Sequence, residues 1–226
     1  MKIIARIQSD YKEKFGIPRQ SMLDSGREAR IVFEPEYRVR EAFVGIEGFS
    51  HLWLIWQFSR SVRDDWSPTV RPPRLGGNRR MGVFATRSPF RPNPIGLSSV
   101  RLIRVEYTKN EGPVLIVTGA DLLDGTPIYD IKPYLSFTDS HPDAVGGFAA
   151  EVKDYAIGVV IPEEACRGIA EEDISAIRSI LAQDPRPSYK KDTDKEYAFR
   201  FSKYEIFFRP SEDGLAVTKI EILKDK

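Results

Sequence analysis

Cysteine and histidine are scarce in this sequence: its 226 residues include one cysteine, Cys166, and two histidines, His51 and His141. A single cysteine excludes a disulfide within the chain, and these few residues cannot form a Cys/His zinc site. We therefore expect no metal centre, and the lone thiol favours a reducing, cytoplasmic setting. Neither histidine lies in a motif typical of nucleophilic catalysis.

Long apolar runs and two common ligand-binding motifs are also missing. The start of the chain, MKIIARIQSDYKEKFG, mixes charges into its apolar run, and no later stretch reaches the ~18 apolar residues that a membrane helix needs. No G-x-G-x-x-G follows a predicted strand, and no G-x-x-x-x-G-K-[ST] occurs. The sequence thus predicts no membrane insertion, and it lacks both the dinucleotide fingerprint and the phosphate-cradling loop.

Arginine, in contrast, is concentrated in one segment. Between Trp66 and Val105 there are eight arginines, no lysine and no acidic residue, and because the whole chain carries +1, the remainder carries −7. The eight are Arg71, Arg74, Arg79, Arg80, Arg87, Arg91, Arg101 and Arg104. The planar guanidinium suits bidentate contact with phosphate or carboxylate, so the segment favours an anion or nucleic-acid contact over an ordinary solvated surface.

The hydrophobic pattern predicts a mainly β protein with two domains. Short β-type runs recur through residues 1–142, separated by Gly, Pro, Asn and Asp clusters, which indicates a barrel or a sandwich with one short helix at 37–46. A linker follows around FTDSHPDAVGGFAAEVKD. A smaller α+β domain at 150–226 is predicted to hold a helix from Glu171 to about Ala182 and an antiparallel meander of three strands.

Three loops combine polar side chains with a stiff backbone. In EKFGIPRQS, Pro18 restrains Arg19 and Gln20 as a plausible ligand clamp, although a plain surface turn also fits. In RSPFRPNPIG, three prolines force extended geometry on Arg91 and Asn93, and the alternative is a structural corner of a barrel.

The third loop, in DLLDGTPIYDIKPY, contains an Asp-Gly turn with further hydrogen-bonding groups at strand ends. Asp124 and Gly125 form the turn, and a simple turn role is the strong alternative for Asp124. The other polar residues are Asp121, Asp130, Lys132 and Tyr134.

Five stretches, in this order along the chain, resemble one family. SDYKEKFGIPRQ, EGFSHLWLIWQF, RPPRLGGNRRMGVFATRSPFRPNPIGLSSVRL, DLLDGTPIYDIKPY and LAQDPRPSYKK are similar to the TrmO (TsaA-like or YaeB) tRNA methyltransferases. The resemblance implies a homodimer with a β-barrel-like catalytic domain, unlike the doubly wound methyltransferase fold. It also implies that S-adenosylmethionine (SAM) methylates N6 of the threonylcarbamoyl-adenosine beside the anticodon of certain tRNAs.

The resemblance also implies which residues contact the cofactor. They are Pro18, Arg19, Gln20, Ser59, Arg60, Arg87, Leu97, Asp124, Gly125 and Thr126. This chain has FSR where family members have FHQ, which favours backbone contacts at Ser59 and Arg60. Arg19 or Arg87 is expected to hold the methionine carboxylate or the RNA, because a cation repels the sulfonium.

Two residues are candidates for catalysis by residue type and motif position. Methyl transfer requires an amine placed in line with the methyl group and acceptor oxygens near the charge that arrives on nitrogen, so no metal is needed. Asn93, followed by Pro94, is similar to the Asn-Pro or Asp-Pro pairs by which other amino-methyltransferases hold an amine. Asp130 is the second candidate acceptor.

The remaining candidates are contacts to the tRNA. They are Arg74, Arg79, Arg80, Arg91, Lys132 and Tyr134 in the first domain, and Arg186 and Tyr189 in the second. For LAQDPRPSYKK, a helix stop followed by a solvated turn is an equal alternative. Two other functions stay open at this point: a non-catalytic RNA-binding module and a small-molecule hydrolase or transferase.

Overall fold

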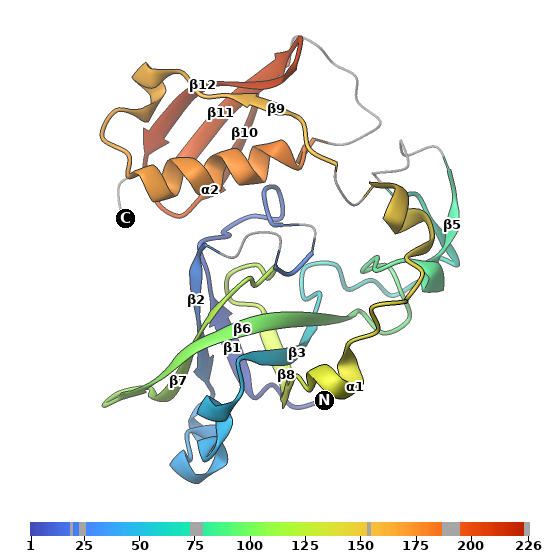
Figure 1. The fold of residues 1–226 in the computed structure, drawn as a ribbon, viewed down its shortest axis with the longest axis vertical. Helices are drawn as coiled ribbons and strands as arrows, with labels where there is room; N and C mark the ends of the chain where they lie inside the picture. Colours follow the sequence, from blue (N-terminus) through green and yellow to red (C-terminus); the bar gives the residue numbers. More distant parts are fainter. Residues whose placement is uncertain (19, 23–25, 73–78, 153–154, 187–194, 224–226) are drawn as a thin grey trace.

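The structure is a computed structural model that describes residues 1–18, 20–22, 26–72, 79–152, 155–186 and 195–223. It is mainly β, as the sequence predicts. Buried apolar side chains form two clusters, one within the first 131 residues and the other built mostly from residues 157–220. Figure 1 shows the two sheets one above the other, with the N-terminal sheet below.

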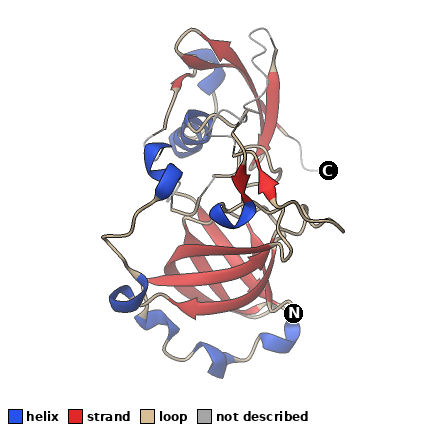
Figure 2. Ribbon diagram, turned by 90° about the vertical axis from the view of Figure 1, so that its right-hand side faces the viewer, coloured by secondary structure: helices blue, strands red, loops and turns tan. Residues whose placement is uncertain are grey.

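Six antiparallel strands form the N-terminal sheet, and they close into a barrel in the order β1-β2-β7-β6-β3-β8, with β8 pairing again with β1. The curved sheet is seen from the side in Figure 2. The strands are β1 (Ala5–Gln8), β2 (Glu28–Phe33), β3 (His51–Gln57), β6 (Ile95–Thr108), β7 (Gly112–Thr118) and β8 (Pro127–Pro133).

Alternation along the strands determines which side chains fill the barrel. In β3, Leu52, Leu54 and Trp56 are 0–6% exposed, whereas the residues between them are half-buried and point outward. Gly96 of β6 lies opposite Trp56, and a Cβ atom at this position would come within 2.2 Å of the indole ring. Glycine is therefore required where the tryptophan crosses the barrel interior.

The C-terminal sheet has the order β10-β11-β12-β9, and helix α2 packs on it. Its elements are β9 (Gly158–Val160), α2 (Glu171–Ala182), β10 (Tyr197–Phe201), β11 (Tyr204–Ser211) and β12 (Gly214–Ile222). Both the predicted helix and the antiparallel pairing of the last three strands are confirmed. β9 adds a parallel edge next to β12.

Short elements lie between the strands of these sheets. They are the 3-10 turns η1 (Pro35–Tyr37), η2 (Arg40–Phe43), η3 (Ile46–Gly48), η5 (Val83–Ala85), η6 (Gly147–Val152) and η7 (Glu163–Cys166), the strands β4 (Thr69–Val70) and β5 (Met81–Gly82), and helix α1 (Ser136–Asp139). Within the described ranges, no helix is both long and apolar enough to cross a membrane.

The single helix predicted at 37–46 is wrong. The chain there forms separate 3-10 turns, because Val39 and Val44 are extended and Gly45 has a left-handed φ of 87°. Each of these residues interrupts the helical hydrogen-bond ladder. The apolar spacing that suggested a helix instead places Phe43 edge-on against Phe33 in the barrel core.

The loop after β1 joins the two halves of the molecule. Tyr11 pairs with Phe201 of β10, and Phe15 and Ile17 pack against the C-terminal hydrophobic cluster. Gly16 has a φ of 97° and its Cα lies so close to Phe199 that a Cβ would be 2.7 Å from the ring. The loop that leads to Pro18 is therefore held by the core of the C-terminal sheet.

Candidate active site

Three loops of the barrel meet through Gln20, Arg87 and Asp121. The guanidinium of Arg87 donates a hydrogen bond to the side-chain oxygen of Gln20. The backbone N–H of Ser21 donates to the carboxylate of Asp121, which also feels the positive charge of Arg87. The loop after β1, the loop before β6 and the segment after β7 thus converge at one place.

Asp121 ends a buried chain of hydrogen bonds. The indole N–H of Trp56 donates to the Ser98 hydroxyl over 3.0 Å, and that hydroxyl donates to Asp121 Oδ1 over 2.5 Å. Burial raises the pKa of the Asp121 carboxyl, although the hydrogen bonds from Ser98 and the backbone and the charge of Arg87 oppose this shift. A carboxylate with a raised pKa beside a cation is typical of functional sites.

The Asp124 turn braces the loop after β1. Asp124 accepts hydrogen bonds from the backbone N–H of Ser9 and from the ammonium of Lys12, both over 2.9 Å. Gly125, with a φ of 75°, donates its N–H to the carbonyl of Ile7. Thr126 is 3% exposed, so its buried side chain supports the turn from within.

Residues 58–61 lie next to the same loops. The N–H of Phe58 donates to the carbonyl of Pro94 over 2.9 Å, which ties this segment to the proline-rich loop. The ammonium of Lys14 contacts the carbonyl of Arg60 and the hydroxyl of Ser61. The side chains of Ser59 and Arg60 are both exposed, and the backbone carbonyl of Arg60 already has Lys14 as a partner.

The proline-rich loop is braced by its own side chains. Arg91 donates to the carbonyls of Thr86 and Ser88, and the Thr86 hydroxyl donates to the carbonyl of Val83. Part of the hydrogen-bonding capacity of Arg91 is therefore used within the loop rather than available to a ligand. Asn93 is exposed, and its carbonyl accepts a hydrogen bond from the N–H of Ile95.

Asp130 and Leu97 lie on the outer wall of the barrel. Both pair with Ile55, from opposite sides, and Leu97 is 55% exposed. Asp130 forms an exposed ion pair with Lys132 over 3.1 Å. Among the contacts of the described residues, none joins Asp130 to Asn93, so the structure does not bring the two candidate acceptors into direct contact.

Tyr134 belongs to an aromatic group at the end of β8. Its ring is 5.5 Å from that of Trp53 and 6.1 Å from that of His51. The backbone N–H of Leu135 donates to Asp139, as does the indole N–H of Trp53, and these two bonds lower the pKa of the Asp139 carboxyl.

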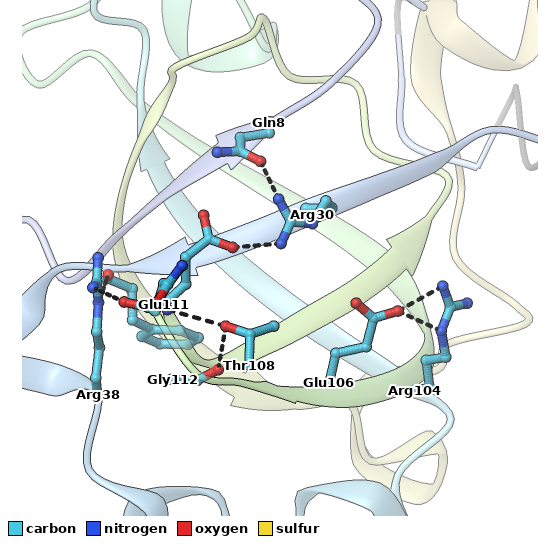
Figure 3. Close-up of polar contacts among 10 residues, drawn as sticks. Gln8, Arg30, Arg38, Arg104, Glu106, Thr108, Glu111 and Gly112 are labelled. Carbon is cyan, nitrogen blue, oxygen red and sulfur yellow. Dashed lines mark hydrogen bonds and ion pairs between the residues drawn. The ribbon is translucent and has the colours of Figure 1, made fainter.

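The arginines of the basic segment differ in their partners. Arg104 forms ion pairs with Glu28 and Glu106, so its charge is neutralised within the protein; Figure 3 shows its pair with Glu106 beside the Arg30–Glu111 pair. Within the part of the chain that the structure describes, six arginines of the segment have no carboxylate within ion-pair distance. The six are Arg71, Arg79, Arg80, Arg87, Arg91 and Arg101.

The remaining predicted site residues fall into two groups. Arg186 forms a two-pronged ion pair with Asp184, at 2.7 and 2.9 Å, so its charge is largely satisfied within its own turn. Arg19, Arg74 and Tyr189 lie outside the described residues. In those ranges that are described, no group of His, Cys, Asp and Glu side chains is arranged to hold a metal ion.

Asp121 is the residue of this site to which the sequence pattern assigned no role. It follows the apolar run of β7, and the sequence predicts only a polar group at a strand end. Its half-buried position depends on Ser98 and Trp56, which are 23 residues and more away along the chain. The sequence feature that points to Asp121 is its place, as an acidic residue, soon after a strand that is buried along almost its whole length.

The closed six-stranded barrel followed by a four-stranded sheet has been seen in solved structures. The crystal structure of TrmO from Pseudomonas aeruginosa has a TM-score of 0.73 to this chain at 32% identity, and the match covers 97% of each chain. The fold is therefore that of the TrmO proteins.

Sequence comparisons then identify the family. Residues 6–140 match the tRNA-methyltransferase O N-terminal domain, and residues 159–223 match the TrmO C-terminal domain. The chain belongs to the tRNA-methyltransferase O family. It is 42% identical to a tRNA (adenine(37)-N6)-methyltransferase of Escherichia coli, over 96% of both chains. It is 39% identical to a putative S-adenosylmethionine-dependent methyltransferase of Pseudomonas aeruginosa, over 96% of this chain and 95% of that one.

Proposed function

We propose that this protein is a SAM-dependent tRNA methyltransferase that methylates N6 of the adenosine at position 37, in its threonylcarbamoyl form. The observation that carries the proposal is the convergence of the family motifs: residues 14–18, 20–21, 58–61, 87–94 and 121 are linked by direct contacts at one end of the barrel. Its full-length relatives are named for this activity. We further propose a cytoplasmic homodimer, with domain boundaries at 1–142 and 150–226.

The charges and shapes at this end of the barrel fit SAM. Arg87 is an exposed cation suited to the methionine carboxylate, and the exposed Leu97 offers apolar area. When bound, SAM supplies a methyl group already activated by its sulfonium. Gln20 orients Arg87, and the Asp124 turn holds the loop that carries Pro18 and Gln20. Loops that are ordered in advance reduce the entropy lost on binding.

Two acceptors are proposed to serve the amine. Asn93 would accept a hydrogen bond from N6 and fix its direction, and Asp130 would stabilise the positive charge that develops on nitrogen as the methyl group arrives. Asp130 lies 3.1 Å from the ammonium of Lys132, in an exposed ion pair. As the methyl group bonds to N6, N6 loses its proton, and a carboxylate passes this proton to the solvent.

The arginines that lack an internal partner are proposed to hold the RNA backbone. Arg71, Arg79 and Arg80 lie at the ends of the β4–β5 pair, and each neutralised phosphate releases counterions. We extend this proposal to Arg74, Arg91, Lys132, Tyr134, Arg186 and Tyr189. The guanidinium groups of Arg91 and Arg186 also bond within their own loops.

The deciding experiment measures transfer of labelled methyl from SAM to tRNA, followed by mass spectrometry of the nucleosides. tRNA with and without the threonylcarbamoyl group is compared. Transfer confined to the modified nucleoside is the expected result. Tight tRNA binding without transfer would instead indicate an RNA-binding module, and transfer to unmodified adenosine would correct the substrate.

A further inference from the structure

Two aromatic side chains are exposed side by side near the β4–β5 pair. Trp66 is 48% exposed and Phe84 is 74% exposed, and their rings are nearly parallel, with an interplanar angle of 28° and centroids 5.9 Å apart. β5 lies at the edge of the molecule in Figure 1, away from the C-terminal sheet. Large aromatic surface left in water at such a position indicates a binding surface.

The backbone holds these two rings in place. β4 pairs with β5, and the N–H of Val83 donates to the carbonyl of Pro68 over 3.0 Å, so the ladder extends to the residues beside both rings. The Ser67 hydroxyl donates to the carbonyl of Thr69, which fixes the backbone after Trp66. Phe84 lies in the 3-10 turn η5, three residues before Arg87.

A depression borders the tryptophan. It has a volume of about 380 Å³ and is lined by Arg63, Asp64, Asp65, Trp66, Ser67 and Phe90. The guanidinium of Arg63 lies 3.9 Å from the centroid of the Phe90 ring, so a planar cation covers this second aromatic side chain. The depression thus offers flat aromatic and guanidinium faces together with two carboxylates.

The charges around the depression restrict what it can bind. Asp64 and Asp65 line the depression itself and would repel a phosphate group there. Arg71, Arg79 and Arg80 flank the same strand pair and attract a polyanion. A neutral flat group attached to a polyanion satisfies both conditions, since the carboxylates accept hydrogen bonds from its amino group.

We propose that Trp66 and Phe84 form a stacking platform for an unpaired nucleobase of the RNA substrate, with Arg63 and the adjoining depression receiving its edge. Stacking on aromatic side chains is the usual means of holding bases splayed out of an RNA loop. The inference rests on the proposed function, because it takes tRNA as the substrate. It adds a base-binding subsite next to Arg87.

The test measures affinity for an RNA hairpin with the sequence of a tRNA anticodon arm. Trp66→Ala and Phe84→Ala should each weaken binding about tenfold, since stacking contributes ~1–3 kcal/mol per base. SAM affinity should stay unchanged, and Trp66→Phe should restore most of the RNA affinity. Tyr107→Ala is the matched control, because Tyr107 is 46% exposed and carries Arg40 over its ring at 4.5 Å, on the β6–β7 hairpin.

Several outcomes would overturn the platform. One is an unchanged hairpin affinity in Trp66→Ala, and another is an equal loss of affinity for a blunt RNA duplex of the same length, which has no unpaired base. A change in oligomeric state on size-exclusion chromatography that accounts for the loss would mean that the rings contact a second copy of the chain.

The experiments can reject the stacking platform without rejecting the proposed function, and the reverse. If the wild-type protein methylates tRNA and Trp66→Ala does so with unchanged KM for tRNA, only the platform is wrong. If the wild-type protein transfers no methyl group but binds the hairpin through Trp66, the platform stands and the proposed function is wrong.

Discussion

At the residue scale, the site depends on whether each charged side chain already has a partner. Among the described residues, Arg87 donates a hydrogen bond to a neutral amide and feels the charge of the half-buried Asp121, whereas Arg104 of the same segment is held by two glutamates. Exposed ion pairs contribute little to stability, but they reduce the charge that a ligand meets. The presence or absence of an internal carboxylate partner therefore distinguishes arginines that the amino-acid composition cannot tell apart.

Replacing Arg87 with alanine should raise the Kd for SAM about tenfold or more, because a charge-assisted hydrogen bond is worth ~1.5–3 kcal/mol. The unfolding temperature should change little, since Arg87 is exposed. Isothermal titration calorimetry with SAM measures the effect directly. Arg104→Ala is the control and should bind SAM like the wild type. Unchanged affinity in Arg87→Ala would remove this residue from the cofactor site.

The Asp121→Asn variant tests the buried carboxylate. Burial raises the pKa of Asp121, so the folded protein binds this proton more tightly than the unfolded chain does. The resulting contribution to the free energy of unfolding is lost as the pH rises through the pKa of Asp121 in the folded protein. The variant has no such loss. Its melting temperature should exceed that of the wild type at neutral pH, and the gap should narrow as the pH falls toward the ordinary value of 3.8. Scanning fluorimetry across pH measures this.

The rate of methyl transfer should fall in Asp121→Asn, since a neutral amide does not attract the charge of Arg87 and cannot take up a proton as a carboxylate can. A variant that is less stable than the wild type at neutral pH would show that the hydrogen bonds from Ser98 and Ser21 outweigh the cost of burying the carboxylate. Retained activity would assign Asp121 to the support of the barrel alone.

At the element scale, the site consists of loops whose shape is set by their ends. The loop after β1 is tied to the Asp124 turn at Ser9 and Lys12, and it then enters the C-terminal core through Phe15 and Ile17. The proline-rich loop is braced by Arg91 and Thr86. Neither loop therefore needs a long hydrogen-bond ladder of its own to keep its shape.

The register of β6 against β3 places Gly96 over Trp56, and this contact is a test of the barrel interior. Gly96→Ala puts a Cβ within 2.2 Å of the indole, and overpacking of this kind costs about 1–3 kcal/mol. Urea unfolding should show the loss. Gly82→Ala is the control, because its Cβ would meet nothing within 4 Å. Equal stability of the two variants would mean that Trp56 can move aside.

At the scale of the whole molecule, positive charge is concentrated in one segment, and ion pairs and a hydrogen bond join the loop after β1 to the C-terminal sheet and its helix. Arg27 joins Asp10 of the loop after β1 to Asp173 of α2, at 2.9 and 2.7 Å, and the Tyr204 hydroxyl donates to Asp173. Burial and this hydrogen bond raise the pKa of Tyr204 to about 12. The C-terminal sheet is thus coupled to the loop that carries Pro18 and Gln20.

Salt should weaken tRNA binding steeply, because arginines without internal partners neutralise phosphates and release counterions. A plot of log affinity against log salt should lose about one unit of slope in Arg79→Ala, whereas Arg104→Ala should keep the wild-type slope. Filter binding over a range of potassium chloride concentrations measures both. A slope that falls equally in the two variants would mean that the internal ion pairs open when RNA binds.

The sequence by itself determined what depends on neighbours along the chain. Strand alternation, the helix from Glu171 to Ala182, the stiffness of the proline-rich loop and the family motifs are all local, and the structure agrees with the predicted strands and helix. Only the tertiary structure decided which polar groups already have hydrogen-bond or ion-pair partners within the protein. The buried chain from Trp56 to Asp121 and the pairing of Arg104 or Arg186 depend on contacts between residues whose positions are set by strand pairing and turn geometry. A sequence pattern specifies which groups exist, whereas burial and partners arise when distant segments pack together.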